Sequence, residues 1–446
     1  MKRLNIMFAV LIAGLMFPAC DAVNLDDINP NTSVPADGAI NNAASAQAAI
    51  NGVYDELQMT TTNHLDAYLG LAQIYSDEAI FTGTFPTRFE FNNLNVTTSN
   101  TTNANVFTEF YDIINTANNV LELLPKVDDP SLSEGLRNSF LGEARFARAL
   151  SYFYLTNYYG DVPLVLTPTR EVGDVLNVPN NTQADIYAQI ISDLEFAEAN
   201  LTTSDTKKAT ATAASAFLAR VYLYLEDWGN ALSSAEAVLG ADFDLTTFAY
   251  MADEIFYLGF TPADGNVLNF WYGPSELGGR HDIEPSPKFL TQYEEGDIRR
   301  DLTVDDSYEV ATVPYVVKYD DFSAGISGAA TDPIMLFRYA ETLLIAAEAA
   351  AEQGDFDKAN GYYNQVRARA GLEDKTLDAS NFVDLILQER LIELAFEGAH
   401  RFLDLRRRGR ATTEIEGYQS CHDFWPIPQR EIDRNPNLSQ NNCCNC

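Results

Sequence analysis

Two segments of this 446-residue chain place alanine, tyrosine and valine at the same intervals. They are TAASAFLARVYLYLEDWGNALSSAEAVLG (212–240) and ETLLIAAEAAAEQGDFDKANGYYNQVRARAG (341–371). The matching positions are, in order, Ala219, Tyr222, Ala231, Ala235 and Val238 in the first segment and Ala347, Ala350, Ala359, Tyr363 and Val366 in the second. Residues three or four positions apart share one face of a helix, so each segment predicts a helix, a tight turn and a second helix.

This spacing is that of a tetratricopeptide helix pair, in which small residues let two antiparallel helices approach closely and aromatic residues fill the gaps. The turn GDFDKA at 354–359 is close to the repeat consensus. A generic pair of antiparallel helices is the alternative. The units lie 128 residues apart, counted from Ala231 to Ala359, so they are not a plain tandem array. We expect a mainly α fold in which tetratricopeptide-like hairpins build a superhelical scaffold.

Helical periodicity also covers residues 45–58, 105–125, 135–160 and 180–201. Thr182 is expected to cap the last of these helices, with Asp185 three residues further on. Between the two hairpins, at roughly 240–335, the helical period fades, glycine and proline recur, and NVLNFWYG (266–273) alternates as a strand does. The expected organisation is a signal peptide at 1–19, a tether at 20–42, an N-terminal helical tetratricopeptide-like part at 43–240, a loop-rich ligand-binding insertion at 241–335, and a C-terminal helical part with a cysteine-containing tail at 336–446.

The N-terminus has the features of an export signal. Lys2 and Arg3 precede an apolar run that ends at Ala19, and this run is shorter than the ~20 residues of a membrane-spanning helix. Cys20 follows directly, as in bacterial lipoprotein signals, where the thiol is alkylated by diacylglycerol and becomes the new N-terminus. We expect Cys20 to carry the lipid anchor, including fatty acids such as palmitate, because several acyl chains hold a protein stably to a bilayer. An ordinary signal with a cysteine there by chance is the alternative.

The amino-acid composition limits the partners that this protein can bind and indicates how its cysteines are used. The net charge of −35 becomes −37 once the leader, which contains Lys2, Arg3 and no acid, is removed. So acidic a chain is a poor partner for nucleic acid and for anionic lipid surfaces. In an exported protein, the four late cysteines are expected to form disulfides, with Cys421 tying down the tail and the pairing left open. Adjacent cysteines do not fit the usual zinc spacing. These candidates are Cys421, Cys443, Cys444 and Cys446.

No catalytic constellation stands out. The sequence has no phosphate-binding glycine loop, no G-x-S-x-G and no HExxH, and its four histidines are scattered. We therefore expect no enzyme activity, no cofactor and no dedicated metal site. The one dense basic run, DLRRRGR (404–410), is interpreted as structural, with its arginines paired to carboxylates such as Glu397 or Asp404.

Aromatic residues in two loop segments suggest a ligand site. Sugars present apolar C–H faces and a rim of hydroxyls, so they suit a flat ring beside arginine, asparagine or carboxylate hydrogen-bonding groups. FTGTFPTRFEFNN (81–93) and NFWYGPSELGGRHD (269–282) supply that mixture. At least one of Trp271 and Tyr272 is expected to be internal. The candidate ligand-binding residues are Phe85, Arg88, Phe89, Trp271, Tyr272, Arg280 and His281.

Taken together, the chain resembles the SusD/RagB family of outer-membrane nutrient-binding lipoproteins over nearly its whole mature length. The resemblance rests on the Cys20 start with NLDDINPN and on EARFARALSYFYLTNYYGDVPLV, DIYAQIISDLEFAEANL, SPKFLTQYEEGDIRRD, IMLFRYAETLLIAAEAAAEQGD, LILQERLIELAFEGAHRFLDLRRRG and FWPIPQREIDRNPNLSQN. The pattern ER…E…EG.R..DLRR.G is specific, and His400 precedes Arg401 in it. The CCNC tail extends beyond the point where such chains usually end.

The resemblance implies a surface-exposed lipoprotein of a Gram-negative outer membrane that caps a SusC-like TonB-dependent β-barrel transporter. Such a protein captures an oligosaccharide and closes over the barrel for import. The family's shared motifs are mainly scaffold, so they transfer no ligand residues to this chain. The alternatives are a peptide-binding lid, a lipoprotein that only assembles the barrel complex, and a surface glycoside hydrolase.

Overall fold

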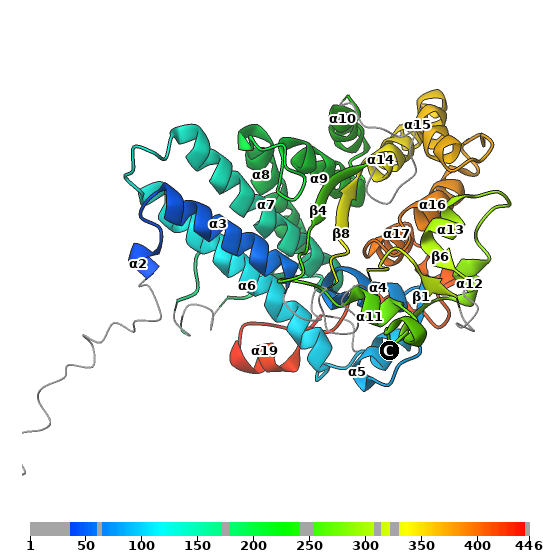
Figure 1. The fold of residues 1–446 in the computed structure, drawn as a ribbon, viewed down its shortest axis with the longest axis horizontal. Coiled ribbons are helices and arrows are strands. Elements are labelled where there is room, and N and C mark those ends of the chain that lie inside the picture. Colours follow the sequence, from blue (N-terminus) through cyan, green and yellow to red (C-terminus); the bar gives the residue numbers. More distant parts are fainter. Residues whose placement is uncertain are drawn as a thin grey trace, which may run out of the picture.

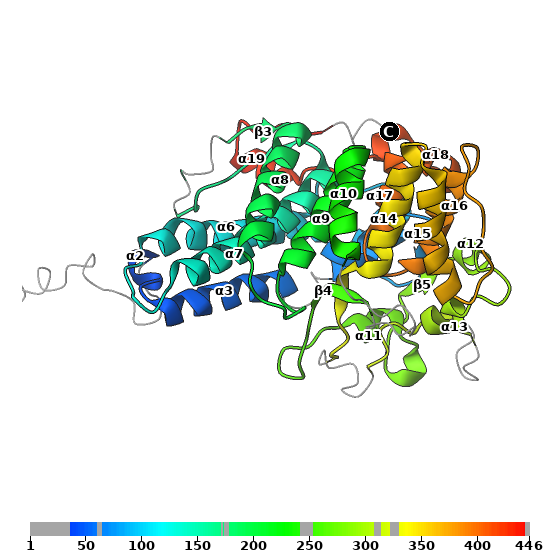
Figure 2. The same cartoon turned by 90° about the horizontal axis from the view of Figure 1, so that it is seen from above.

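The computed structural model describes residues 36–59, 65–170, 173, 178–240, 253–306, 314–321 and 330–441. The predicted signal peptide, Cys20, Cys443, Cys444 and Cys446 lie outside the described residues. Figures 1 and 2 show an elongated helical body, with long N-terminal helices at one end and the helices of residues 339–407 at the other, while the last helix, Gln429–Arg434, lies beside the N-terminal helices. Among the described residues, no helix combines the length and the apolar character needed to cross a bilayer.

Long helices build the N-terminal part. They are α3 (Ala43–Gln58), α6 (Thr101–Leu123), α7 (Glu134–Tyr159) and α8 (Gln183–Asn200), and the single turn α2 (Ala36–Ala39) precedes them. α7 packs against α6 and α8 and is buried almost continuously from Ser139 onward. It ends at Gly160, whose φ of 75° suits glycine. The predicted cap of α8 is confirmed as a capping box. The Thr182 side chain accepts a hydrogen bond from the Asp185 backbone N–H, and the Asp185 side chain accepts one from the Thr182 backbone N–H.

The two segments with matching spacing form helical hairpins that pack side by side. The first consists of α9 (Ala211–Tyr224) and α10 (Trp228–Leu239), and the second of α14 (Tyr339–Glu352) and α15 (Phe356–Arg369). α10 packs against α14, so units far apart in sequence become neighbours in space (Figure 2). Most residues of this contact are small, namely Ala219, Ala231, Ala235, Ala346 and Ala349, and Leu223 and Ile345 complete it. The predicted mainly α fold with close-packed hairpins is confirmed.

Short elements make up the part between the hairpins. β4 (Glu254–Leu258) pairs antiparallel with β8 (Ile334–Arg338), and β6 (Val304–Asp305) pairs with β7 (Tyr315–Val316). The remaining elements there are α11 (Leu268–Tyr272), the 3₁₀ turn Ser275–Leu277, β5 (Ile283–Pro285), α12 (Pro287–Leu290) and α13 (Arg299–Thr303). The irregular character expected for this region is therefore what the described residues have.

The strand predicted at 266–273 is wrong, because the structure has helix α11 there. Asn266 accepts a hydrogen bond from the Leu268 backbone N–H, which turns the chain into the helix. Leu268, Trp271 and Tyr272 are all buried. Residues three and four positions apart lie on one face of a helix. The apparent alternation of this segment therefore reflects a short, largely buried helix.

The other elements complete the body. Near the N-terminal helices lie the π-helical turn Leu65–Leu69, α4 (Gly70–Ile74), β1 (Ala79–Phe81), α5 (Pro86–Asn92), the 3₁₀ turn Leu124–Lys126, and β2 (Val162–Pro163) paired with β3 (Asn180–Asn181). The C-terminal part contains α16 (Phe382–Glu393), α17 (His400–Arg407), α18 (Ala411–Glu414), the 3₁₀ turn Ser420–His422 and α19 (Gln429–Arg434). Cys421 is joined in a disulfide.

A buried network of ion pairs joins the C-terminal helices to the irregular part. Glu393 of α16 has no side-chain exposure and lies 3.2 Å from the Arg299 guanidinium and 2.9 Å from that of Arg338. It also pairs with Arg369 of α15. Arginines from α13, β8 and α15 thus meet at the Glu393 carboxylate. Because these ion pairs are buried, removing one partner should destabilise the fold.

The basic run at 404–410 is structural, as predicted. Arg407 pairs with Asp404 and Glu348, and Arg408 pairs with Glu352. Glu397, the other carboxylate that the sequence suggested, instead pairs with Arg338 and Lys318. The arginines of this run therefore hold helices together.

Candidate functional site

The two segments predicted to bind ligand lie next to each other. β1 pairs antiparallel with β5, and this pairing places Phe81 opposite Ile283. Beyond the strand, the Thr82 N–H donates to the Asp282 carbonyl oxygen at 2.9 Å. Residues about 200 positions apart are therefore held in register, and α5 and α11 face each other across this junction.

Four of the predicted residues form one cluster. The Arg88 guanidinium lies 4.2 Å from the centroid of the Trp271 ring and 5.4 Å from that of Phe85. The Phe85 and Trp271 rings are 5.4 Å apart and tilted by 55°. Arg280 covers Phe85 with its guanidinium at 4.7 Å. These distances are within the range of cation–π and ring–ring contact.

Two rings of this cluster region reach the surface. Phe85 is 36% exposed and Phe89 is 37% exposed, which is unusual for large apolar side chains. They stand four residues apart at the start and middle of α5, so they lie on one side of the helix. The Phe89 ring also contacts the Phe81 ring edge to face at 5.0 Å. We call the surface formed by Phe85, Phe89 and Arg280 the aromatic face.

Three predicted residues lie beneath the aromatic face. Arg88, Trp271 and Tyr272 are buried, and the expectation that at least one of the last two is internal holds for both. The Tyr272 hydroxyl donates to Gln73 at 2.5 Å. Arg88 and Trp271 contact the Phe85 ring from below, whereas Tyr272 packs against Tyr319 and Phe396.

His281 lies at the rim of the junction. It is half-buried, has a φ of 55° in the left-handed region, and its Nε2 is 3.3 Å from the Pro314 carbonyl oxygen. A positive φ is uncommon for a residue with a side chain and marks a backbone held by its surroundings.

Each arginine of the cluster has its own carboxylate. Arg88 donates to Asp66 at 2.8 Å, and Arg280 donates to Asp282 at 2.5 Å and to the Thr84 hydroxyl at 2.6 Å. Burial raises the pKa of Asp66 to about 6, although Arg88 acts in the opposite direction. Burial also raises the pKa of Asp282 against the pull of Arg280. With both acids ionised, the site is close to neutral and suits an uncharged ligand.

Sequence reasoning missed Asp66 and Asp282 as parts of the site. Asp282 is the last residue of the segment 269–282, but carboxylates are so frequent in this chain that it carried no signal. Asp66 is 22 residues from Arg88 and lies in a π-helical turn. Neither the spacing nor the composition of the sequence marks that contact.

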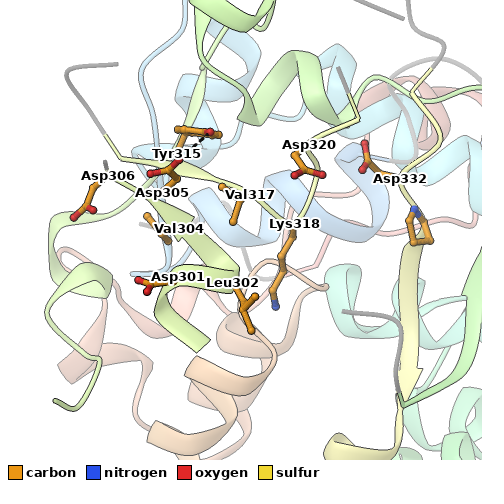
Figure 3. Close-up of a pocket in the computed structure, with 11 residues that line it drawn as sticks. Asp301, Leu302, Val304, Asp305, Asp306, Tyr315, Val317, Lys318, Asp320 and Asp332 are labelled. Carbon is orange, nitrogen blue, oxygen red and sulfur yellow. Dashed lines mark hydrogen bonds between the residues drawn. The ribbon is translucent and has the colours of Figure 1, made fainter. Parts of the chain in front are cut away.

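A cavity elsewhere in the structure, shown in Figure 3, has an acidic lining. It is a cavity of about 710 Å³ between α13, β6, β7 and the residues before β8, and its charged lining is Asp301, Asp305, Asp306, Lys318, Asp320 and Asp332. Lys318 is already paired with Glu397 at 2.5 Å. Among the described residues, no group of three or more histidine, cysteine or acidic side chains is arranged to hold a metal ion. Among the described residues that line this cavity, Tyr315 supplies a ring, but it is buried, in contrast to Phe85 and Phe89.

A buried carboxyl beside β1 gives a pH-dependent prediction. Glu78 accepts a hydrogen bond from the Phe396 N–H at 2.5 Å, and burial raises its pKa from 4.5 to about 8. The folded chain therefore holds a proton there that the unfolded chain releases at lower pH, so this group lowers stability as pH rises from about 4 to about 8. Glu78→Gln keeps the acceptor and removes the titration.

Thermal unfolding of both proteins between pH 5 and pH 9 measures this effect. The midpoint of the Glu78→Gln variant should rise relative to the parent protein as pH increases. Curves that stay parallel over this range would mean that Glu78 is not protonated in the folded state.

The described geometry defines a class of protein: a helical-repeat scaffold that carries an exposed aromatic face on irregular segments. Residues 25–223 match the family model described as "Starch-binding associating with outer membrane", and residues 291–443 match the model described as "SusD family". The chain belongs to the SusD family.

Individual relatives agree with this assignment. SusD-like protein P2 of Formosa agariphila is 27% identical, with 99% of each chain covered. A SusD superfamily protein from Bacteroides vulgatus has a TM-score of 0.78 at 23% identity, covering 89% of this chain and 98% of its own. A solved structure described as a laminarin-binding SusD-like protein has a TM-score of 0.77 at 24% identity, covering 90% of this chain and 99% of its own. The two solved structures share the fold of this chain.

Proposed function

We propose that this protein binds an uncharged oligosaccharide on the aromatic face and acts as the lid of a SusC-like TonB-dependent transporter. Membership of the SusD family, with its outer-membrane association, supports the location and the partner. The predicted lipid on Cys20 would hold the protein at the outer membrane, exposed at the cell surface. The role is capture and transfer, without a chemical step.

The observation that carries the binding role is the pair of exposed rings on α5. Phe85 and Phe89 are each more than a third exposed and lie on the same side of the helix. Phe85 is the N-cap residue of α5 and Phe89 lies one turn into the helix, so their α-carbons are ~6 Å apart along its axis. Two flat apolar surfaces at that spacing suit neighbouring sugar units of one chain.

The charges around the face favour an uncharged glycan. Arg280 is held by Asp282 and Thr84, and its guanidinium still has N–H groups that can reach sugar hydroxyls. A glycan carrying carboxylate or sulfate groups would approach a chain of net charge −35 against repulsion. The laminarin-binding protein with the same fold makes a β-glucan the first ligand to test.

A panel of ligands tests this proposal. The mature chain is titrated with laminarin oligosaccharides, maltooligosaccharides and a mixed peptide pool, and released reducing ends are assayed in parallel. We expect binding to one glycan class, with modest affinity because exposed sugars bury little apolar area, and no released reducing ends. Binding to peptides alone would establish the peptide-binding lid, and release of reducing ends would establish a hydrolase.

A further inference from the structure

The carboxylate of Asp66 is buried behind the aromatic face and pairs with Arg88, one of the residues beneath that face. Both of its oxygens lie 2.8 Å from the same Arg88 nitrogen, and the Asp66 and Arg88 side chains are only 5% and 7% exposed. Arg88 in turn contacts the rings of Trp271 and Phe85. A chain of direct contacts therefore runs from Asp66 through Arg88 to the exposed Phe85 ring.

We propose that Asp66 is a positioning residue for the glycan site: it fixes the Arg88 guanidinium, which holds the Phe85 ring in its exposed pose. Asp66 does not touch the glycan in this account. The inference deepens the proposed function and rests on it for its link to binding, but the pose of Phe85 can be measured without any ligand.

The energetics of the Asp66–Arg88 ion pair indicate that it fixes the position of the Arg88 side chain and adds little stability. Burial raises the pKa of Asp66 by more than Arg88 lowers it, so removing the acid from water costs more than the pairing returns. Buried pairs of this kind are often replaced by apolar residues with little loss of stability. Within the described part of the chain, the Arg88 Nε has no hydrogen-bond partner. Within the described residues, Asp66 is the carboxylate that pairs with Arg88, and the Trp271 and Phe85 rings also contact the guanidinium.

Few other charges act at this point. Among the groups described, Arg88 from α5 is the charge that acts on Asp66, and Asp282 on the β5 side is influenced by Arg280, Arg88 and His281 in that order. The folded carboxyl of Asp66 takes up its proton as pH falls through about 6. Protonation ends the ion pair, so the Phe85 ring should be held at neutral pH and released in mild acid.

The test follows Phe85 directly. Fluorophenylalanine is placed at position 85 of the mature chain, and its ¹⁹F resonance is recorded from pH 5 to pH 8. We expect a shift with a midpoint near pH 6. Asp66→Asn should abolish this titration, as should the double variant Asp66→Asn with Arg88→Met, which carries neither charge and so leaves no unpaired buried ion. The same label at position 89, which packs on Phe81, is the matched control and should not titrate with this midpoint.

A second arm links the pose to binding. With laminarin oligosaccharides or maltooligosaccharides as the probe, the double variant should bind about three- to tenfold more weakly at pH 7.5, the cost of ordering one freed side chain. A position-85 resonance that is identical and independent of pH in all three proteins would overturn the positioning role. If no glycan in the panel binds the parent protein, the proposed function fails while the fluorine result still decides the role of Asp66.

Discussion

Replacing Phe85 and Phe89 together with alanine is expected to weaken glycan binding by about ten- to a hundredfold, because each well-placed aromatic contact contributes about 0.5–1.5 kcal/mol. Both rings are already more than a third exposed, so truncation removes little core packing. The free energy of unfolding should therefore change far less than the free energy of binding. Calorimetric titration with the oligosaccharide selected by the ligand panel measures the first effect, and thermal unfolding measures the second.

The matched control for this pair is Leu225→Ala. Leu225 is 40% exposed in the turn between α9 and α10, so it is as accessible as the two rings but belongs to the scaffold. Its replacement should leave glycan affinity unchanged. Unaltered affinity in the double alanine variant, with a correctly folded protein, would show that the aromatic face is not where glycan binds.

Replacing Glu393 with glutamine is expected to lower the free energy of unfolding by about 3–5 kcal/mol, the usual cost of breaking a buried ion pair from one side. The substitution leaves Arg299, Arg338 and Arg369 without their common carboxylate. Each arginine keeps at least one other carboxylate partner, but the buried carboxylate that joins α16 to α15, β8 and α13 is lost. Chemical denaturation of the purified variant measures the loss.

The matched control lies on the same helix. Asp384 of α16 pairs with Arg410 at the surface, where the two side chains are 67% and 41% exposed. Asp384→Asn should cost less than about 1 kcal/mol, as exposed pairs usually do. Equal losses from the two substitutions would contradict the view that the buried network holds the C-terminal helices to the irregular part.

The same network sets the response to acid. Burial alone would raise the pKa of Glu393, but attraction from Arg369, Arg338 and Arg299 outweighs burial and lowers it. A lowered pKa means that the stabilisation is complete above the ordinary carboxyl pKa and is lost as pH falls below it. The parent protein should therefore lose stability in strong acid more steeply than the Glu393→Gln variant does.

The scaffold was predictable because its signals are local. Caps such as Thr182 act on the next turn, and the alanine spacing of the two hairpins reports close helix contact directly. The packing of α10 on α14 was not predictable, because the spacing predicts each hairpin but does not indicate which helix surfaces meet. Helix α11 was predicted as a strand because its buried residues leave no single polar face to reveal the period.

The site was predictable only in part. Aromatic and arginine residues marked two loop segments, and the β1–β5 pairing brings these segments together. In the structure, Phe85 and Phe89 are exposed, whereas Arg88, Trp271 and Tyr272 are buried. The sequence alone does not show which of these residues reach the surface. The partner carboxylate Asp66 comes from a third segment through a tertiary contact.

The most direct test of the central claim is a crystal structure of the mature chain with the oligosaccharide that the panel selects. We predict sugar rings stacked on Phe85 and Phe89, with hydroxyls within hydrogen-bond distance of Arg280. Sugar bound elsewhere, for example in the acidic cavity lined by Asp305 and Asp332, with the aromatic face empty, would contradict the account.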